Sequence, residues 1–406
     1  MLSDKNLQQF IKTHVTGRQE SLLLADLEKF DNELRQRIDG KNVLVIGGAG
    51  SIGSAYIKAI LKFRIAKLVV VDIDENGLTE LVRDLRSSDN YNLPEVFITY
   101  PVNYGDRVFE KLFLHHGPFH IVANFAAHKH VRSEKDIFSI EAMIQNNVLR
   151  AKGLLDLMLI SPPEHFFCVS TDKAANPVNI MGASKKLMEE LIMAYSGKLN
   201  IKTARFANVA FSNGSLPLGF IERMRKQQPL ACPRGIRRYF VSPRESGELC
   251  LIASVLGESG DIFFPKLDED RDMIPFDQIA IDFLKYAGME ADPCETEEEA
   301  RHKASQLNGS SVKYPIYFFN SDTSGEKSFE EFYTLDENPD TETFINLGVI
   351  KNDRGRTIEE VEQILNNLYK LFETKEVTKK AIVTILKESL PAFDHLETDK
   401  GLDSKM

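Results

Sequence analysis

An acid and a base stand side by side in this sequence, at Asp172 and Lys173. A carboxyl group next to an amine can give and take protons in one place, which is what general acid–base catalysis needs. The hydroxyl of Thr171 precedes them. Met181 and Lys185 follow, and because they are four residues apart they share one face of a helix. These five residues are the candidate catalytic group.

Secondary-structure signals place this group at the end of a strand. Residues 166–169 form an apolar run typical of a buried parallel strand. Residues 185–195 carry apolar side chains at helical spacing. Open α/β sheets bind ligands where their strands end and their helices begin. The sequence therefore predicts an active site between these two elements.

A glycine-rich turn follows another predicted strand, at residues 42–46. Its spacing is Gly-x-x-Gly-x-x-Gly, which allows a tight turn and a close approach of the backbone to a pyrophosphate, with the N-terminus of the next helix pointing at the phosphates. Five residues are expected to bind a dinucleotide here: Gly47, Gly50, Ser51, Ile52 and Gly53.

Asp72 ends the next predicted strand, at residues 67–71, and lies 72 − 53 = 19 residues past the last glycine of the turn. An acidic residue at this distance hydrogen-bonds the ribose hydroxyls of the adenosine. Its charge disfavours a 2′-phosphate, so NAD is predicted rather than NADP. A strand at 120–127 ends in Ala126 and Ala127, whose small side chains let the chain pass close to the nicotinamide ribose.

The segment STDKAANPVNIMGASK, from Ser170 to Lys185, resembles the nucleotide-sugar 4,6-dehydratases of the short-chain dehydrogenase/reductase superfamily, chiefly those acting on UDP-N-acetylglucosamine. Met181 stands where most of the superfamily has tyrosine, but some of these dehydratases also carry Met. The resemblance covers roughly residues 41–335. It implies an α/β protein with a Rossmann-type doubly wound parallel sheet and a smaller C-terminal α/β substrate domain.

The resemblance also implies roles for residues outside the catalytic group. Asn103 stands where relatives place an Asp at the adenine edge, with Tyr104 beside it, and Lys185 is expected at the nicotinamide ribose. The substrate-binding residues that the resemblance implies are Lys129, Asn208, Ser215, Arg238 and Glu326. Arg238 is read as a phosphate clamp because a guanidinium pairs two phosphate oxygens. His128 and His130 flank Lys129, but no third ligand stands at a useful spacing, so no metal is predicted.

In the reaction of this family, we expect Lys173 to remove the C5 proton of the sugar and Asp172 to expel water at C6. Met181 cannot take a proton, so oxidation at C4 needs another route, either a water held by Thr171 or a relay through Lys185. Three alternatives stay open: a differently linked nucleotide-sugar such as a GDP-sugar, an enzyme that inverts C5 or acts as an epimerase, and a non-catalytic NAD-binding regulator.

The composition fits a globular protein of 406 residues with a formal net charge of −10, which disfavours a nucleic-acid partner. Four dispersed cysteines indicate reduced thiols, and no long apolar run predicts a membrane span, so we expect a cytoplasmic protein. Amphipathic ends favour a homo-oligomer, a dimer or larger. The predicted divisions are a helical extension (1–40), the NAD-binding domain (41–204), a substrate-binding region (205–345), part of which returns to the NAD-binding domain, and a helical tail (346–406).

Overall fold

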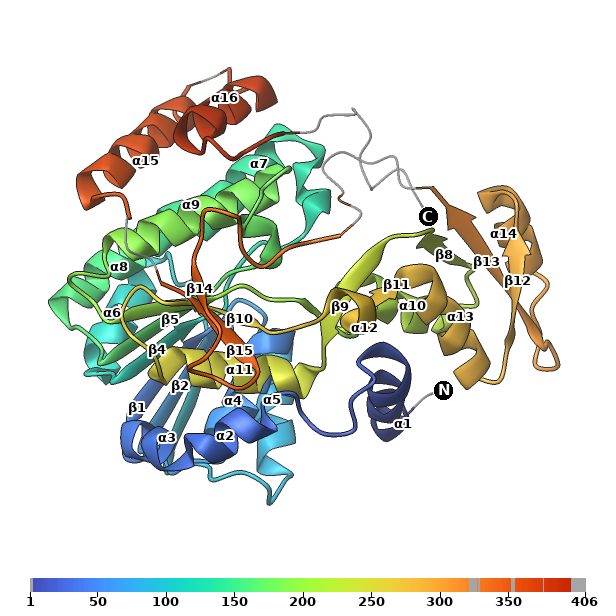
Figure 1. Cartoon of the computed structure of the whole chain (residues 1–406), viewed down its shortest axis with the longest axis horizontal. Helices are drawn as coiled ribbons and strands as arrows, with labels where there is room; N and C mark the ends of the chain where they lie inside the picture. Colours follow the sequence, from blue (N-terminus) through green and yellow to red (C-terminus); the bar gives the residue numbers. More distant parts are fainter. Residues whose placement is uncertain (1–2, 321–326, 328, 352–354, 375, 396–406) are drawn as a thin grey trace.

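The computed structural model describes residues 3–320, 327, 329–351, 355–374 and 376–395. A nine-stranded sheet organises the larger part of the molecule, in the order β14-β15-β10-β6-β5-β4-β1-β2-β3 (Figure 1). The pairs from β3 to β10 are parallel, and β15 and β14 add antiparallel pairs at one edge. Its strands are β1 (Asn42–Ile46), β2 (Lys67–Asp72), β3 (Val96–Pro101), β4 (Ile121–Asn124), β5 (His165–Val169), β6 (Ile201–Ala204), β10 (Ile262–Pro265), β14 (Pro339–Asp340) and β15 (Leu347–Ile350).

Helices cover both faces of this sheet, which explains why its central strands are apolar runs without alternation. In Figure 1, α4 and α11 lie against one face and α8 and α9 against the other, with α15 and α16 outside α9. The helices of this part are α2 (Leu24–Lys29), α3 (Asp31–Ile38), α4 (Ser51–Ile60), α5 (Glu75–Arg86), α6 (Arg107–His116), α7 (Ile137–Ile144), α8 (Arg150–Ile160), α9 (Ile180–Ala194), α11 (Pro243–Val255), α15 (Ile358–Phe372) and α16 (Lys379–Ser389).

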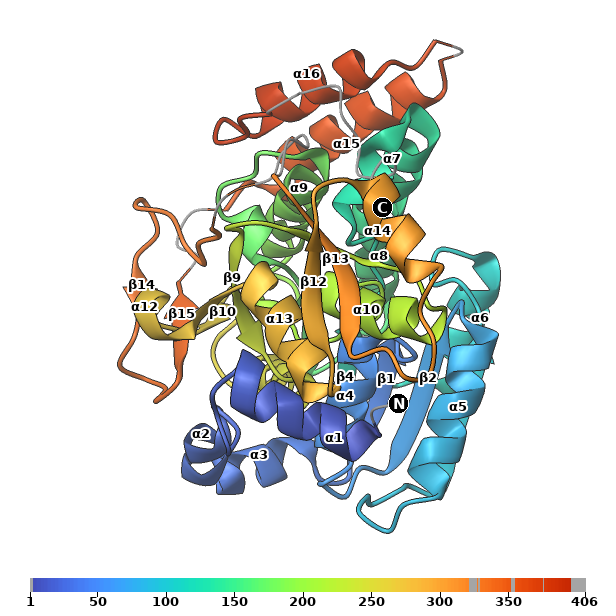
Figure 2. The same cartoon turned by 90° about the vertical axis from the view of Figure 1, so that its right-hand side faces the viewer.

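The smaller part has two three-stranded sheets, β11-β9-β7 and β12-β13-β8, and a hydrophobic core of its own. The N-terminal helix α1 (Asp4–Phe10) packs on it rather than on the large sheet (Figure 2). The ring of Phe10 lies 5.8 Å from the rings of both Phe211 and Phe283. The remaining elements are β7 (Asn208–Val209), β8 (Leu230–Pro233), β9 (Arg237–Val241), β11 (Met273–Pro275), β12 (Glu290–Cys294), β13 (Lys313–Phe319), α10 (Leu216–Arg225), α12 (Glu269–Asp272), α13 (Phe276–Tyr286) and α14 (Glu297–Ala304).

The predicted fold class, a Rossmann-type doubly wound sheet with a smaller α/β part, is confirmed. One predicted division differs from expectation: the stretch from 346, predicted as helical, begins with β15, which pairs antiparallel with β10. The polar stretch 290–313 contains β12, which pairs in parallel with β13, a partner that no local pattern reveals. A π-helical turn at Gln145–Leu149 separates α7 from α8.

All four cysteines are buried and free, as predicted. Among the helices of the described ranges, none has the length and apolarity needed to cross a bilayer.

Candidate active site

The glycine-rich turn lies between the ends of β1 and β4, where the strand order reverses direction. Gly47 has a φ of +77°, and a Cβ added to it would lie 2.6 Å from the backbone nitrogen of Ala126. A Cβ on Gly53 would lie 2.2 Å from the carbonyl oxygen of Gly47. Because such distances are closer than any real Cβ contact, both positions require glycine for the turn to close.

Gly50 is the N-cap of α4, so the backbone N–H groups of Ser51 and Ile52 face out of the turn. At the end of β2, the Asp72 carboxylate accepts a hydrogen bond from the nitrogen of Ala49 at 2.9 Å. This bond fixes the acidic group beside the glycine turn. A close-approach turn, a helix N-terminus and an acid at the neighbouring strand end together fit the diphosphate and ribose of a dinucleotide.

Two predicted adenine-side residues make local contacts. The Asn103 side chain accepts a hydrogen bond from the nitrogen of Gly105 at 2.9 Å, closing its own turn. The Tyr104 side chain is buried, and its hydroxyl donates to the carbonyl of Asn146. Burial raises the pKa of Tyr104 well above its usual value. Their contact with a cofactor stays a prediction.

The Asp172–Lys173 pair lies in a 3-10 turn directly after β5. The Lys173 Nζ is 3.0 Å from Oδ1 of Asp172, and the same oxygen accepts the Thr171 hydroxyl at 2.8 Å. Asp172 is 3% exposed, so the acid is withdrawn from solvent, while the Lys173 side chain is partly exposed at 19%. Its adjacency in sequence and its position at the carboxyl edge of the sheet are as predicted.

A second carboxylate lies against the same amine, and the sequence reading missed it. Oε1 of Glu330 is 3.6 Å from Nζ of Lys173, and Glu330 is 4% exposed. Burial alone would lower the pKa of Lys173, but Asp172 and Glu330 outweigh it and raise this pKa. Lys173 is therefore an ammonium group in this arrangement. Glu330 is followed by Glu331, and two successive acids are typical of a solvated surface, so no local signal marked it.

Met181 and Lys185 lie in the first turns of α9, and Lys185 faces the end of β5. The Lys185 amine donates to the carbonyl oxygen of Val169 at 2.6 Å, and burial lowers the pKa of Lys185. Met181 is 2% exposed and belongs to the hydrophobic core. Asn147 ties this helix to the loop after β4, because its amide donates to the carbonyl of His128 at 2.9 Å and to the Ser184 hydroxyl at 3.1 Å.

The predicted substrate residues lie in different surroundings. Arg238 is buried in β9 and acts electrostatically on both Lys173 and Glu330, which places its charge at the catalytic pair. Asn208 lies in β7, paired with β9. Lys129 is exposed on the loop after β4, and Ser215 caps α10 by accepting from the nitrogen of Leu218. Glu326 lies outside the described residues.

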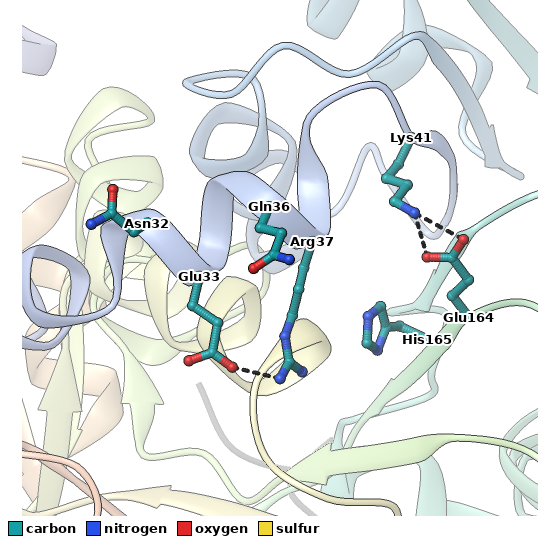
Figure 3. Close-up of a pocket in the computed structure, with 7 residues that line it drawn as sticks. All are labelled: Asn32, Glu33, Gln36, Arg37, Lys41, Glu164 and His165. Carbon is teal, nitrogen blue, oxygen red and sulfur yellow. Dashed lines mark hydrogen bonds and ion pairs between the residues drawn. The ribbon is translucent and has the colours of Figure 1, made fainter.

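A separate cavity of about 630 Å³ lies at the opposite edge of the sheet (Figure 3). It is lined by Asn32, Glu33, Gln36, Arg37, Lys41, Glu164 and His165. Lys41 and His165 flank the amino ends of β1 and β5, so this cavity is remote from the strand ends that carry the catalytic pair. Its charges are paired internally, since Lys41 contacts Glu164 and Arg37 contacts Glu33.

Sequence comparison assigns the family. Residues 43–351 match the profile described as "Polysaccharide biosynthesis protein". The chain belongs to this family.

Three curated relatives are similar to this chain. The probable polysaccharide biosynthesis protein EpsC of Bacillus subtilis is 31% identical over 59% of this chain and 40% of its own length. The UDP-N-acetylglucosamine 4,6-dehydratase (inverting) of Campylobacter jejuni is 30% identical over 56% of this chain and 68% of its own. A UDP-glucose 4-epimerase of Rickettsia bellii is 30% identical over 56% and 66%. The chain thus spans well under half of the length of EpsC.

The fold also has solved counterparts. The dTDP-glucose 4,6-dehydratase DesIV of Streptomyces venezuelae, with NAD and TYD bound, superposes with a TM-score of 0.53 at 17% identity, over 73% of this chain and 88% of DesIV. This likeness supports the fold described above.

Proposed function

We propose that this protein is an NAD-dependent nucleotide-sugar 4,6-dehydratase that converts UDP-N-acetylglucosamine to its 4-keto-6-deoxy derivative. The observation that carries the proposal is the Asp172–Lys173 pair, with a 3.0 Å separation, at the strand ends next to a dinucleotide-type turn. Water elimination needs an acid and a base that act on neighbouring carbons, and this pair supplies both. The Campylobacter jejuni relative bears the name of this activity.

The residues around the glycine turn fit the cofactor. Gly47 and Gly53 let the turn close tightly, α4 offers its N-terminus to a diphosphate, and Asp72 is fixed where ribose hydroxyls would bind. Lys185 supplies an amine at the end of β5 for the nicotinamide ribose. Bound NAD would accept a hydride from C4 and return it to C6.

The catalytic pair reaches its reactive forms by one proton shift. In the ion pair, Lys173 holds three protons on Nζ and Asp172 is a carboxylate; moving one proton along the hydrogen bond to Oδ1 yields an amine and a carboxylic acid. The amine then takes the C5 proton, and Asp172 gives its proton to the departing C6 hydroxyl, which leaves as water. Lys173 later returns its proton to C5. At the end of the cycle Asp172 is a carboxylate and must regain a proton before the next turnover. The proton of the C4 hydroxyl leaves by a separate route.

Met181 favours a dehydratase over a 4-epimerase. Its thioether cannot accept the proton of the C4 hydroxyl, whereas the Thr171 hydroxyl lies next to the acid, donates its proton to Asp172 and accepts from the Lys173 nitrogen, which leaves one lone pair on its oxygen to hold a water. The buried guanidinium of Arg238 adds positive charge for the substrate diphosphate near the same pair. A cytoplasmic location and a homo-oligomer remain part of the proposal.

The test is incubation of the purified protein with UDP-N-acetylglucosamine and catalytic NAD, followed by mass spectrometry and proton NMR. We expect loss of one water and a new C6 methyl signal, and the C5 proton coupling reports retention or inversion. If UDP-N-acetylglucosamine stays intact, the substrate assignment is wrong, and a panel including GDP-linked sugars follows. If the whole panel stays intact while NAD binds, the protein is a non-catalytic NAD-binding regulator.

A further inference from the structure

We propose that Glu330 is a third acid–base residue of this site, which passes a proton through Lys173 to reload Asp172 after each turnover. The inference rests on the proposed function. Glu330 acts through Lys173 and is therefore a positioning residue, with no contact to the sugar required.

Two carboxyl groups form ion pairs with the same amine. Nζ of Lys173 is 3.0 Å from Oδ1 of Asp172 and 3.6 Å from Oε1 of Glu330. The amine is thus the shared neighbour of two carboxyl groups. A proton that leaves one carboxyl can reach the other through this single nitrogen, because the neutral amine takes a proton on its lone pair and the ammonium group so formed donates a different proton to the other carboxylate.

Glu330 has the properties of a proton-carrying group. It is 4% exposed, and its Oε2 has no hydrogen-bond partner within the described ranges, although Nζ of Lys327 lies 3.8 Å away. The charged groups that face it are Asp172, Lys173, Arg238 and Lys327. Burial, reinforced by the Asp172 charge, raises the pKa of Glu330 despite the three cations. A buried carboxyl with a raised pKa keeps its proton to a higher pH than an exposed carboxyl does.

The chain directly after Glu330 is anchored, which holds the carboxyl at the amine. Two residues later, the Phe332 carbonyl accepts from the buried Arg205 guanidinium at 2.9 Å. The Phe332 ring packs 5.2 Å from that of Tyr239. Glu331 accepts from the amide of Asn176 at 2.9 Å and points to the exposed side.

The proton balance of the relay is closed. After elimination and return of the C5 proton, Asp172 is a carboxylate and Lys173 an amine. Glu330, as a carboxylic acid, gives its proton to Nζ of Lys173, and Lys173 gives a proton to Oδ1 of Asp172. One O–H bond breaks at Glu330 and one forms at Asp172. Glu330 then takes a proton from solvent, so each cycle consumes one solvent proton while one leaves from the C4 hydroxyl.

The experiment compares single-turnover and multiple-turnover rates of water loss for the wild type, Glu330→Gln, Glu330→Asp and the matched control Glu331→Gln. In Glu330→Gln, the single-turnover rate should stay within about two-fold of the wild-type rate, whereas the multiple-turnover rate should fall at least about ten-fold. Glu330→Asp should restore part of the multiple-turnover rate, and Glu331→Gln should match wild type in both. Equal losses in both rates, or no loss in either, would overturn the relay.

A readout independent of turnover separates this inference from the proposed function. Carbon-13 NMR of Cε-labelled lysine, assigned with Lys173→Arg, gives the pKa of Lys173 directly. Because the Glu330 charge raises this pKa, it should fall in Glu330→Gln and not in Glu331→Gln. An unchanged pKa would overturn the inference even if the enzyme dehydrates its substrate. If the wild type is inert on every nucleotide-sugar, the proposed function fails, and a lowered pKa would then show only that the charges of the two groups interact.

Discussion

Removing the amine of Lys173 is expected to abolish turnover while leaving the fold and NAD binding intact. The ammonium group contacts only the catalytic carboxylates among the described residues, and it is the proposed base at C5. Loss of a positioned acid–base group typically slows a reaction by about 100-fold or more. Steady-state assays and NAD titration of Lys173→Ala test this, with the exposed Lys198→Ala as control. Asp172→Asn should behave in the same way, and full activity in either variant would refute the assigned roles.

Replacing Met181 with tyrosine, the residue that most of the superfamily has at this position, is expected to lower the dehydratase activity. Met181 is packed in the core at 2% exposure, so a larger side chain with a hydroxyl there costs about 1–3 kcal/mol in the free energy of unfolding and displaces its neighbours. Activity assays of Met181→Tyr and Met181→Leu separate the effect of side-chain size from that of losing the sulfur, because Leu keeps the volume of Met but has no sulfur. Wild-type activity in Met181→Tyr would show that the pocket does not depend on Met.

His165, at the cavity edge in Figure 3, predicts a pH dependence of stability. Burial, with the charges of Lys202 and Arg37, lowers the pKa of His165 to about 4. The unfolded chain, with a pKa near 6.5, binds the proton first, so stability is complete above pH 6.5 and is lost as the pH falls toward 4. The loss amounts to about 3 kcal/mol. Urea unfolding of His165→Gln should show a shallower decline over this window; an identical decline would exclude His165 as its source.

At the scale of elements, adding a single methyl group at Gly53 is expected to distort the glycine turn and weaken NAD binding. In Gly53→Ala the new Cβ would meet the Gly47 carbonyl oxygen at 2.2 Å, so α4 must shift away from the turn. We expect NAD affinity to fall at least about ten-fold while the sheet stays folded. Gly153→Ala is the matched control, because it lies in α8 with nothing within 4 Å and should stabilise that helix by up to about 1 kcal/mol. If calorimetric titration finds the same NAD affinity for Gly53→Ala and the wild type, the assignment of this turn to dinucleotide binding is contradicted.

The elements visible in sequence are those whose signals are local. The strand–turn–helix at Gly47–Gly53 and the strand before Asp172 carry their own patterns, so both were predicted with nearly correct bounds. The start of α9 was placed too late because its N-cap, Asn179, lies before the apolar repeat. β12 was missed because its stability comes from pairing with β13, which is a tertiary contact.

The same distinction applies to the candidate site. Asp172 and Lys173 are neighbours in the chain and could be recognised together, whereas Glu330 is 330 − 173 = 157 residues away and reaches the amine only through the fold. Its neighbour Glu331 has the same side chain but is exposed. Sequence alone does not distinguish the two, since burial depends on the anchoring of Phe332 by Arg205.

At the scale of the whole molecule, Arg18 joins the two parts. Its guanidinium binds Glu245 of α11 at 2.8 Å and Asp272 of α12 at 3.2 Å, and both acids are buried. Arg18→Met would leave Glu245 buried without its cation, at an expected cost of about 3–5 kcal/mol in the free energy of unfolding. Chemical denaturation measures this cost. The exposed pair of Arg83 with Glu80 provides the control, because Arg83→Met should change stability by less than about 0.5 kcal/mol, and an equal effect would refute the special role of Arg18.

The packing of α1 on the smaller part also affects how the chain folds while it is being synthesised. Phe10 leaves the ribosome early, but its partner Phe283 is synthesised 283 − 10 = 273 residues later. At about 5–20 residues per second, the apolar face of α1 waits roughly 15–55 seconds for its binding surface. During that interval the nascent chain exposes a hydrophobic helix that the finished protein hides, so its yield in a cell depends on how well chaperones shield that helix while translation continues.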